Sequence, residues 1–131
     1  MSFFDKVFGG ESSNKDTNNS GLEWNDLANL DQLDEIVRES SEVPVVIFKH
    51  STRCGISRMA MKGFEKEYDI DPSQAKPYYL DLLNHRDISN AIAARFGVFH
   101  ESPQLLLIKD GKAIYNESHG NISATALKGK L

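Results

Sequence analysis

Short continuous runs of apolar residues along the chain predict buried strands. The run Val43–Phe48 lacks polar alternation, which is typical of a strand buried on both faces. Two further runs, Tyr78–Leu83 and Gln104–Lys109, predict two more strands. Asp110-Gly111 directly after the last run predicts a tight hairpin turn, with a partner strand over 113–117.

Apolar residues at intervals of three and four predict helices between these strands. One covers 30–37, and another covers Asp87–Phe96 and stops at Gly97, a residue suited to a helix C-cap. A short last helix is predicted from Ser123 towards Leu127. A further helix follows Cys54, and we expect it to turn inward Ile56, Met59, Ala60, Gly63, Phe64 and Tyr68.

With a first strand near Trp24, the predicted order of elements is β-α-β-α-β-α-β-β-α. Alternating strands and helices that end in a hairpin predict an α/β fold, in which helices flank a mixed central sheet on both faces. A chain of 131 residues suits one domain, which we place at 22–131.

Residues 1–21 are expected to form a flexible N-terminal tail. Residues 9–21 are glycine, small polar and charged residues that offer nothing apolar to bury. Four apolar residues precede them at helix-like spacing and would suit a short anchor to a membrane or a partner, although a frayed chain end is the simpler interpretation that we adopt: Phe3, Phe4, Val7 and Phe8.

Composition and charge narrow the classes of function. The chain is 40% apolar and 26% charged, as in ordinary soluble domains, and its net charge of −4 argues against non-specific binding to nucleic acid or an anionic membrane. No apolar run approaches the roughly 18 residues of a membrane span, and the N-terminus lacks the pattern of a signal peptide. A lone cysteine forms no internal disulfide. We therefore expect a cytoplasmic protein.

Cys54, the only cysteine, lies where a predicted strand leads into a helix. A thiol at a helix N-terminus faces unpaired backbone N–H groups and the positive end of the helix dipole, which favour the thiolate. Where a second thiol would complete a C-x-x-C pair, the chain has Ser57. Cys54 is thus the candidate nucleophile. A buried structural thiol is the alternative, and the polar residues around Cys54 argue against it.

The segment around Cys54 is basic. Residues 49–66 contain five lysines and arginines but only one acidic residue. Such a patch favours an anionic sulfur and attracts an anionic thiol conjugate. We expect Arg53, next to the sulfur, to help stabilise the thiolate, and we interpret Lys62 and Lys66 as a solvated helix face.

The order of elements, with a cysteine at the start of the helix after the second strand, resembles the thioredoxin superfamily from Trp24 onward. Within it, the string HSTRCGIS from His50 to Ser57 resembles the YtxJ family of monothiol bacilliredoxins, whose usual form has proline in place of Gly55. The resemblance implies a thiol–disulfide oxidoreductase that removes bacillithiol from protein mixed disulfides through Cys54. Bacillithiol would be its co-substrate, bacillithiolated proteins its partners, and oxidative stress its setting.

The resemblance also implies roles for individual residues. Thioredoxin-like proteins carry a cis-proline that faces the active cysteine, and Pro103, just before the Gln104–Lys109 strand, is its counterpart; an ordinary proline at the start of a strand is the alternative. Ser57 would stabilise the thiolate, or be a plain first-turn serine. The residues expected to contact substrate are Lys49, Thr52, Gly55, Ser102 and Pro103.

The resolving machinery of dithiol thioredoxins is absent. Their second cysteine is replaced by Ser57, and their buried acid, six residues before the first cysteine, is replaced by Phe48. A serine cannot resolve a mixed disulfide, so an external thiol has to do so.

Two other functions remain open. Cys-Gly-Ile-Ser differs by one residue from the Cys-Gly-Phe-Ser of monothiol glutaredoxins, which hold a [2Fe–2S] cluster between two subunits. Against this, Glu101-Ser102-Pro103 stands where they have Thr-Val-Pro. A non-catalytic thioredoxin-like adaptor is the third possibility. No metal site is expected, because the histidines lack metal-ligand spacing: His50, His85, His100 and His119.

Overall fold

The computed structural model describes residues 22–131. The predicted flexible tail over 1–21, with its four apolar residues, lies outside the described residues. The described part contains five strands: β1 (Asn25–Asp26), β2 (Val45–His50), β3 (Lys76–Asp81), β4 (Gln104–Lys109) and β5 (Lys112–Ser118). Its helices are α1 (Asp31–Glu39), α2 (Gly55–Glu67), α3 (Arg86–Phe96), the 3-10 turn η3 (His119–Asn121) and α4 (Ala124–Lys128).

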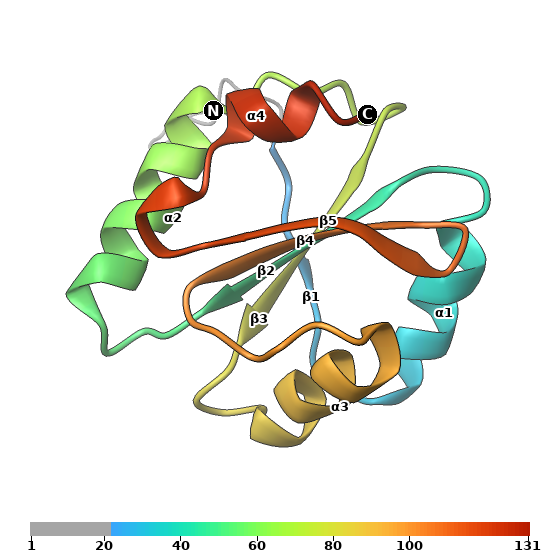
Figure 1. The fold of residues 1–131 in the computed structure, drawn as a ribbon, viewed down its shortest axis with the longest axis horizontal. Helices are drawn as coiled ribbons and strands as arrows, with labels where there is room; N and C mark the ends of the chain where they lie inside the picture. The colour runs from blue at the N-terminus through green and yellow to red at the C-terminus, as the bar shows by residue number, and fades with distance from the viewer. Residues whose placement is uncertain (1–21) are drawn as a thin grey trace, which may run out of the picture.

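The strands form one mixed sheet in the order β1-β3-β2-β4-β5 (Figure 1). β1, β3 and β2 run parallel, whereas β4 runs antiparallel to β2 and β5 antiparallel to β4. The predicted order of elements and the α/β fold class are confirmed. β2 begins and ends two residues later than the predicted run Val43–Phe48, and β3 begins and ends two residues earlier than the predicted run Tyr78–Leu83. The two strands were therefore predicted correctly, with shifted boundaries.

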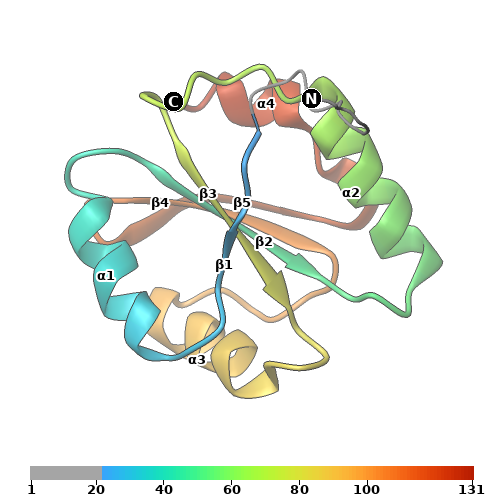
Figure 2. The same cartoon turned by 180° about the vertical axis from the view of Figure 1, so that it is seen from behind.

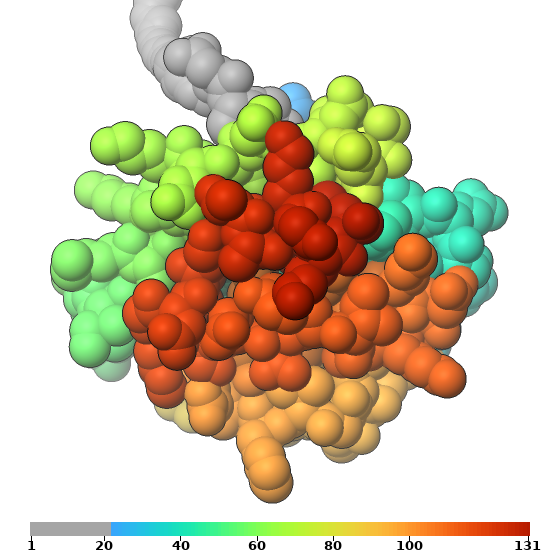
Figure 3. Space-filling view, turned by 45° about the horizontal axis from the view of Figure 1, so that its top comes forward, coloured from blue at the N-terminus to red at the C-terminus, as the bar shows by residue number. Residues whose placement is uncertain are grey.

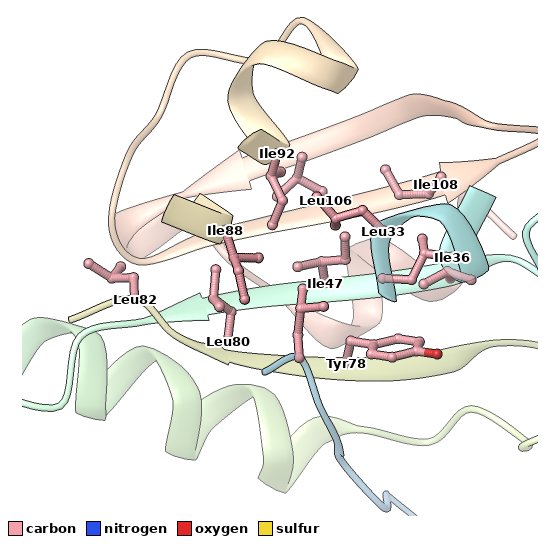
Figure 4. Packing of buried hydrophobic residues seen from close by; sticks show 12 residues of the cluster. Leu33, Ile36, Ile47, Tyr78, Leu80, Leu82, Ile88, Ile92, Leu106 and Ile108 are labelled. Carbon is pink, nitrogen blue, oxygen red and sulfur yellow. The ribbon is translucent and has the colours of Figure 1, made fainter. Parts of the chain in front are cut away.

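Helices cover both faces of the sheet. α1 and α3 lie on one side and α2 and α4 on the other, as the two opposite views show (Figures 1 and 2). The layer under α1 and α3 buries a cluster of aliphatic side chains from both helices and the sheet (Figure 4), among them Leu33, Ile36, Ile47, Ile88, Ile92 and Leu106. The layer under α2 and α4 is more aromatic and includes Phe48, Phe64, Tyr68, Leu105, Leu107 and Leu127.

The central strand explains why its sequence shows no alternation. Successive side chains of β2 enter opposite layers, with Val45 and Ile47 in one cluster and Val46 and Phe48 in the other. Because both layers exclude water, both sets are apolar. All six residues of β2 are buried.

Turns and caps follow the residues that predicted them. Gly97 closes α3 with φ 66°, and Asp110 and Gly111 have φ 51° and 76°, as a two-residue hairpin turn requires. Ser123 caps α4 by accepting the Ala126 N–H at 3.2 Å.

The inward face of α2 differs from the expected one. Phe64 and Tyr68 are buried as predicted, but Ile56 and Met59 are 62% and 76% exposed. The buried stripe runs instead through Ser57, Ala60, Met61 and Phe64, at the intervals of one helix face. The prediction was wrong here because a polar residue, Ser57, occupies the inward position of the first turn.

Candidate functional site

Cys54 lies at the junction of β2 and α2. It is the N-cap of α2 with extended backbone angles, φ −107° and ψ 122°. Its carbonyl accepts the Arg58 N–H at 3.0 Å and its own N–H donates to the Ser51 carbonyl at 3.2 Å, so the backbone around the thiol is held in place. The residue is half-buried and its thiol is free. The geometry leaves the sulfur at the N-terminal end of a 13-residue helix, where the helix dipole favours a negative charge.

Ser57 lies in the first turn of α2 and is fully buried. Its Oγ accepts the Ser51 N–H at 3.0 Å and lies 2.7 Å from His50 Nδ1. Among the described residues it forms no hydrogen bond with Cys54. Ser57 is therefore more than a plain first-turn serine, because it ties the start of α2 to the end of β2, and its direct role in stabilising the thiolate stays a prediction.

His50 is the partner that sequence reasoning missed. It is the last residue of β2, is buried, and its ring lies 5.8 Å from the ring of Tyr79. Burial lowers the pKa of His50 and the Arg58 cation adds to this, whereas the carboxylates of Asp81 and Glu65 oppose it. The signal in the sequence is a histidine at the end of an apolar strand, immediately before the Cys54 loop. Metal-ligand spacing does not detect such a residue.

Lys49 corrects a prediction. Its side chain has no exposed surface, and its Nζ donates to the Ser89 carbonyl at 3.3 Å and lies 3.4 Å from His100 Nδ1. Burial lowers its pKa to about 8. Because the ammonium group is covered on the α3 side of the sheet, the expected contact between Lys49 and substrate is wrong, and Lys49 does not belong to the surface patch around Cys54.

The loop between β2 and α2 exposes Thr52 and Arg53. The Thr52 carbonyl accepts a hydrogen bond from Arg58 Nη1 at 3.2 Å, which places a second guanidinium next to this loop. Gly55 is exposed, and a Cβ added there would lie 3.7 Å from Arg58 Nη2, an ordinary contact. The roles expected for Thr52, Arg53 and Gly55 towards the thiolate or the substrate stay predictions.

Pro103 precedes β4 at the same end of the sheet as the Cys54 loop. The Ser102–Pro103 bond is cis, as expected. The next residue, Gln104, pairs with Lys49 of β2. The Pro103 carbonyl accepts the His119 N–H at 3.0 Å. Ser102 Oγ is buried and forms no hydrogen bond within the described residues. Pro103 and Ser102 thus lie level with the last residues of β2, from which the chain continues to Cys54.

Phe48 is an aromatic residue at the position where dithiol thioredoxins have a buried acid. It has no exposed surface and packs against Phe64 and Trp24, with ring centroids 5.4 and 5.9 Å away. Trp24 Nε1 in turn donates to Glu65 Oε2 at 2.7 Å. Trp24 therefore anchors the start of the domain to α2 and β2.

A groove lies along α2, between that helix and η3. Figure 3 shows η3 and α4 in red next to α2 in green. The groove is lined by residues of both elements and by the residue after η3: Ile56, Met59, Ala60, Gly63 and Glu67 from α2, and His119, Gly120 and Ile122. At its Ile56 end, this groove therefore reaches the first turn of α2, which Cys54 caps.

The described residues contain no group of three histidine, cysteine or acidic side chains placed to hold a metal ion. Within the same part of the chain, no helix has the length and apolar character needed to cross a membrane.

Comparisons with known proteins agree with this geometry. A family model described as monothiol bacilliredoxin BrxC matches residues 25–127. A solved structure described as "a putative oxidoreductase with a thioredoxin fold" is 34% identical, with 79% of this chain and 89% of that chain covered and a TM-score of 0.69. Thioredoxins of Malassezia sympodialis (22% identical, 82% of this chain and 87% of that chain, TM-score 0.62) and Fasciola hepatica (23%, 80% and 93%, TM-score 0.61) share the fold. The fold, the helix-capping thiol and the match over residues 25–127 together establish that the chain belongs to the monothiol bacilliredoxin family.

Proposed function

We propose that this protein removes bacillithiol from protein mixed disulfides, with Cys54 as the nucleophile. The observation that carries the proposal is the setting of Cys54, a half-buried, free thiol that caps α2 and has Ser57 where a resolving thiol would be. Membership in a family of thioredoxin-fold oxidoreductases supports thiol–disulfide exchange as the reaction class.

In the first step the Cys54 thiolate attacks the bacillithiol sulfur of the mixed disulfide. A bond forms between Cys54 Sγ and that sulfur, the original S–S bond breaks, and the client sulfur leaves as a thiolate with the electron pair. The positive end of α2 and the exposed Arg53 would stabilise the attacking thiolate. The client protein is reduced while Cys54 is oxidised to the mixed disulfide.

In the second step an external thiol regenerates Cys54. A free bacillithiol thiolate attacks the bacillithiol sulfur bound to Cys54, bacillithiol disulfide forms, and Cys54 leaves as a thiolate. Ser57 cannot perform this attack, because it has no thiol and its hydroxyl is bonded to His50 and Ser51. A cytoplasmic location suits this chemistry, since thiols are kept reduced there.

Substrate contacts are proposed at both sides of the sulfur. Thr52 and Gly55 flank it on the loop and the first turn of α2, and Ser102 and Pro103 lie at the neighbouring sheet end. The unpartnered, buried Ser102 Oγ would gain a hydrogen bond from a bound chain. The exposed Arg53 would contact the carboxylates of bacillithiol.

The test follows the mass of the intact protein. Wild type and Cys54→Ser are mixed with a bacillithiolated client, and both proteins are weighed by mass spectrometry. We expect a bacillithiol adduct on wild type only, while the client loses its own adduct. Transfer by Cys54→Ser would contradict the mechanism. No transfer by a wild type whose Cys54 reacts freely with iodoacetamide would favour the cluster-binding or adaptor alternative.

A further inference from the structure

Arg58 holds a guanidinium beside the Cys54 loop that the exchange steps above leave unused. It lies four residues after Cys54, and its backbone N–H donates to the Cys54 carbonyl at 3.0 Å, so the two residues share one face of the start of α2. Long side chains of a helix lean towards its N-terminus. The Arg58 side chain does so here, because its Nη1 donates to the Thr52 carbonyl at 3.2 Å.

The second terminal nitrogen of this guanidinium lies beside Gly55. A Cβ added to Gly55 would be 3.7 Å from Arg58 Nη2, which is van der Waals distance. Thr52 and Gly55 enclose the Arg53-Cys54 pair in the chain. The guanidinium therefore reaches from the residue two before the thiol to the residue directly after it, and its place next to the nucleophile is set by the fold.

No carboxylate among the described residues neutralises Arg58. None of the ion pairs within residues 22–131 includes it, and the first turn of α2 contains no acidic residue. A guanidinium has five N–H donors, and the Thr52 carbonyl accepts from one of its two terminal nitrogens. Because the side chain is exposed, its other donors are open to a ligand from solvent.

Arg53 carries the same charge without such an anchor. Its side chain is exposed and, in the part of the chain that the structure describes, makes no hydrogen bond or ion pair. A long side chain that is free in solution has to be ordered when it binds a ligand, whereas one that is already held loses less conformational freedom. Of the two arginines, Arg58 is therefore the one prepared to bind an anion in a defined place.

We propose that Arg58 binds a carboxylate on the small thiol of the mixed disulfide and thereby selects anionic thiol conjugates as substrates of Cys54. A carboxylate matches the fork of a guanidinium and accepts two parallel N–H bonds from it. The carboxylates of bacillithiol lie several bonds away from its sulfur, which suits a cation that is next to the Cys54 loop and not in contact with the attacking sulfur. The inference rests on the proposed function, because it names the residue that recognises the small thiol in that reaction.

The experiment compares two reagents of equal length that differ in charge. Both are mixed disulfides of pyridinethiol, one with mercaptohexanoate, which ends in a carboxylate, and one with mercaptohexanol, which ends in a hydroxyl. The Cys54 thiolate attacks the alkyl sulfur, the new S–S bond joins Cys54 to the alkyl chain, and pyridinethiolate leaves with the electron pair and is followed by its absorbance. Cys54 is the only cysteine, so the full-length protein reports on one site. The quantity measured is the ratio of the two rates, carboxylate reagent over hydroxyl reagent.

Arg58→Gln is expected to lower this ratio about threefold, the size of effect that an exposed ion pair gives. A change in the amount of thiolate alters both rates equally and cancels in the ratio. Lys62→Gln removes an exposed cation one turn further along α2 and is the matched control, with an unchanged ratio expected. Arg53→Gln is expected to lower the ratio less than Arg58→Gln does.

Three results would overturn the inference. They are an unchanged ratio in folded Arg58→Gln, an equal fall in Lys62→Gln, and a larger fall in Arg53→Gln than in Arg58→Gln. Circular dichroism checks the fold of each variant, and Arg58→Met takes the place of Arg58→Gln if the latter is unfolded.

The outcome separates this inference from the proposed function, because neither reagent contains bacillithiol. If Arg58→Gln lowers the ratio while wild type takes no bacillithiol from a client, the proposed function fails and Arg58 still selects an anionic small thiol. If wild type takes bacillithiol from the client and Arg58→Gln keeps the wild-type ratio, the inference fails alone.

Discussion

Lys49 and His50 are consecutive residues of β2 whose side chains are buried in opposite layers of the protein. Lys49 Nζ contacts the Ser89 carbonyl and His100 on the α3 side, whereas His50 Nδ1 contacts Ser57 Oγ on the α2 side. The alternation of a strand thereby directs the ammonium group of Lys49 into the α3 layer and the imidazole of His50 into the layer under α2. Two cations near Cys54 are exposed, Arg53 in the loop before α2 and Arg58 in the first turns of that helix.

Lys49→Met should reduce the increase in the free energy of unfolding that wild type shows as the pH rises above about 8. The pKa of Lys49 is about 8 in the folded protein and 10.5 as a free side chain, so above pH 8 the unfolded chain binds more protons. The free energy of unfolding of wild type therefore increases by up to about 3 kcal/mol as the pH rises from about 8 to 10.5. Methionine fills the same space without a charge.

Urea unfolding at about pH 7.5 and 9.5, below the titration of the free tyrosine side chain, measures this difference. We expect the free energy of unfolding to rise between the two pH values in wild type and to rise less in Lys49→Met. Equal slopes in the two proteins would show that Lys49 keeps its ordinary pKa.

Ser57→Cys should convert the site into a dithiol. Residues 54 and 57 are the N-cap and the third residue of α2, so their side chains lie one turn apart on the same helix end. Diamide should oxidise the variant to an internal disulfide, taking two hydrogens from the thiols. Intact mass before and after reduction gives the result, with Met59→Cys as a control that projects from the exposed side of α2. A variant whose thiols both stay free would contradict the geometry.

Phe64→Ala and Ile56→Ala should separate the buried from the exposed side of α2. Phe64 has 1% of its surface exposed and contacts three other aromatic rings, so its removal should cost about 3–5 kcal/mol. Ile56 is 62% exposed, and its substitution should change stability by about 0.5 kcal/mol or less. Chemical denaturation of both variants is the measurement. A large loss of stability in Ile56→Ala would indicate that Ile56 points inward, as the sequence predicted.

Gly97→Ala and Gly63→Ala should have opposite effects on stability. Neither glycine has an atom within 4 Å of an added Cβ, so packing is not at issue. Gly97 has φ 66°, where alanine is strained by about 1 kcal/mol, whereas Gly63 lies inside α2, where alanine should stabilise by up to about 1 kcal/mol. Thermal unfolding compares the two. A stabilised Gly97→Ala would mean that the left-handed C-cap of α3 is not needed.

The sequence by itself determined the order of elements, the fold class and the candidate nucleophile. Each rests on a local signal: apolar runs for β2 and β4, Gly97 and Asp110-Gly111 for chain reversals, and a lone cysteine between a strand and a helix. Local signals are set by neighbouring residues, so one chain read in order is enough to find them.

Only the tertiary structure decided which side chains meet. Burial of Lys49 under α3, the contact of His50 with Ser57, and the exposure of Ile56 and Met59 all depend on how α2 and α3 are rotated against the sheet. That rotation is a compromise among all the side chains in both layers, including Phe48 and Phe64, which come from separate parts of the chain. For this reason two neighbouring residues of the basic segment, Lys49 and His50, are buried in different layers, Lys49 under α3 and His50 under α2.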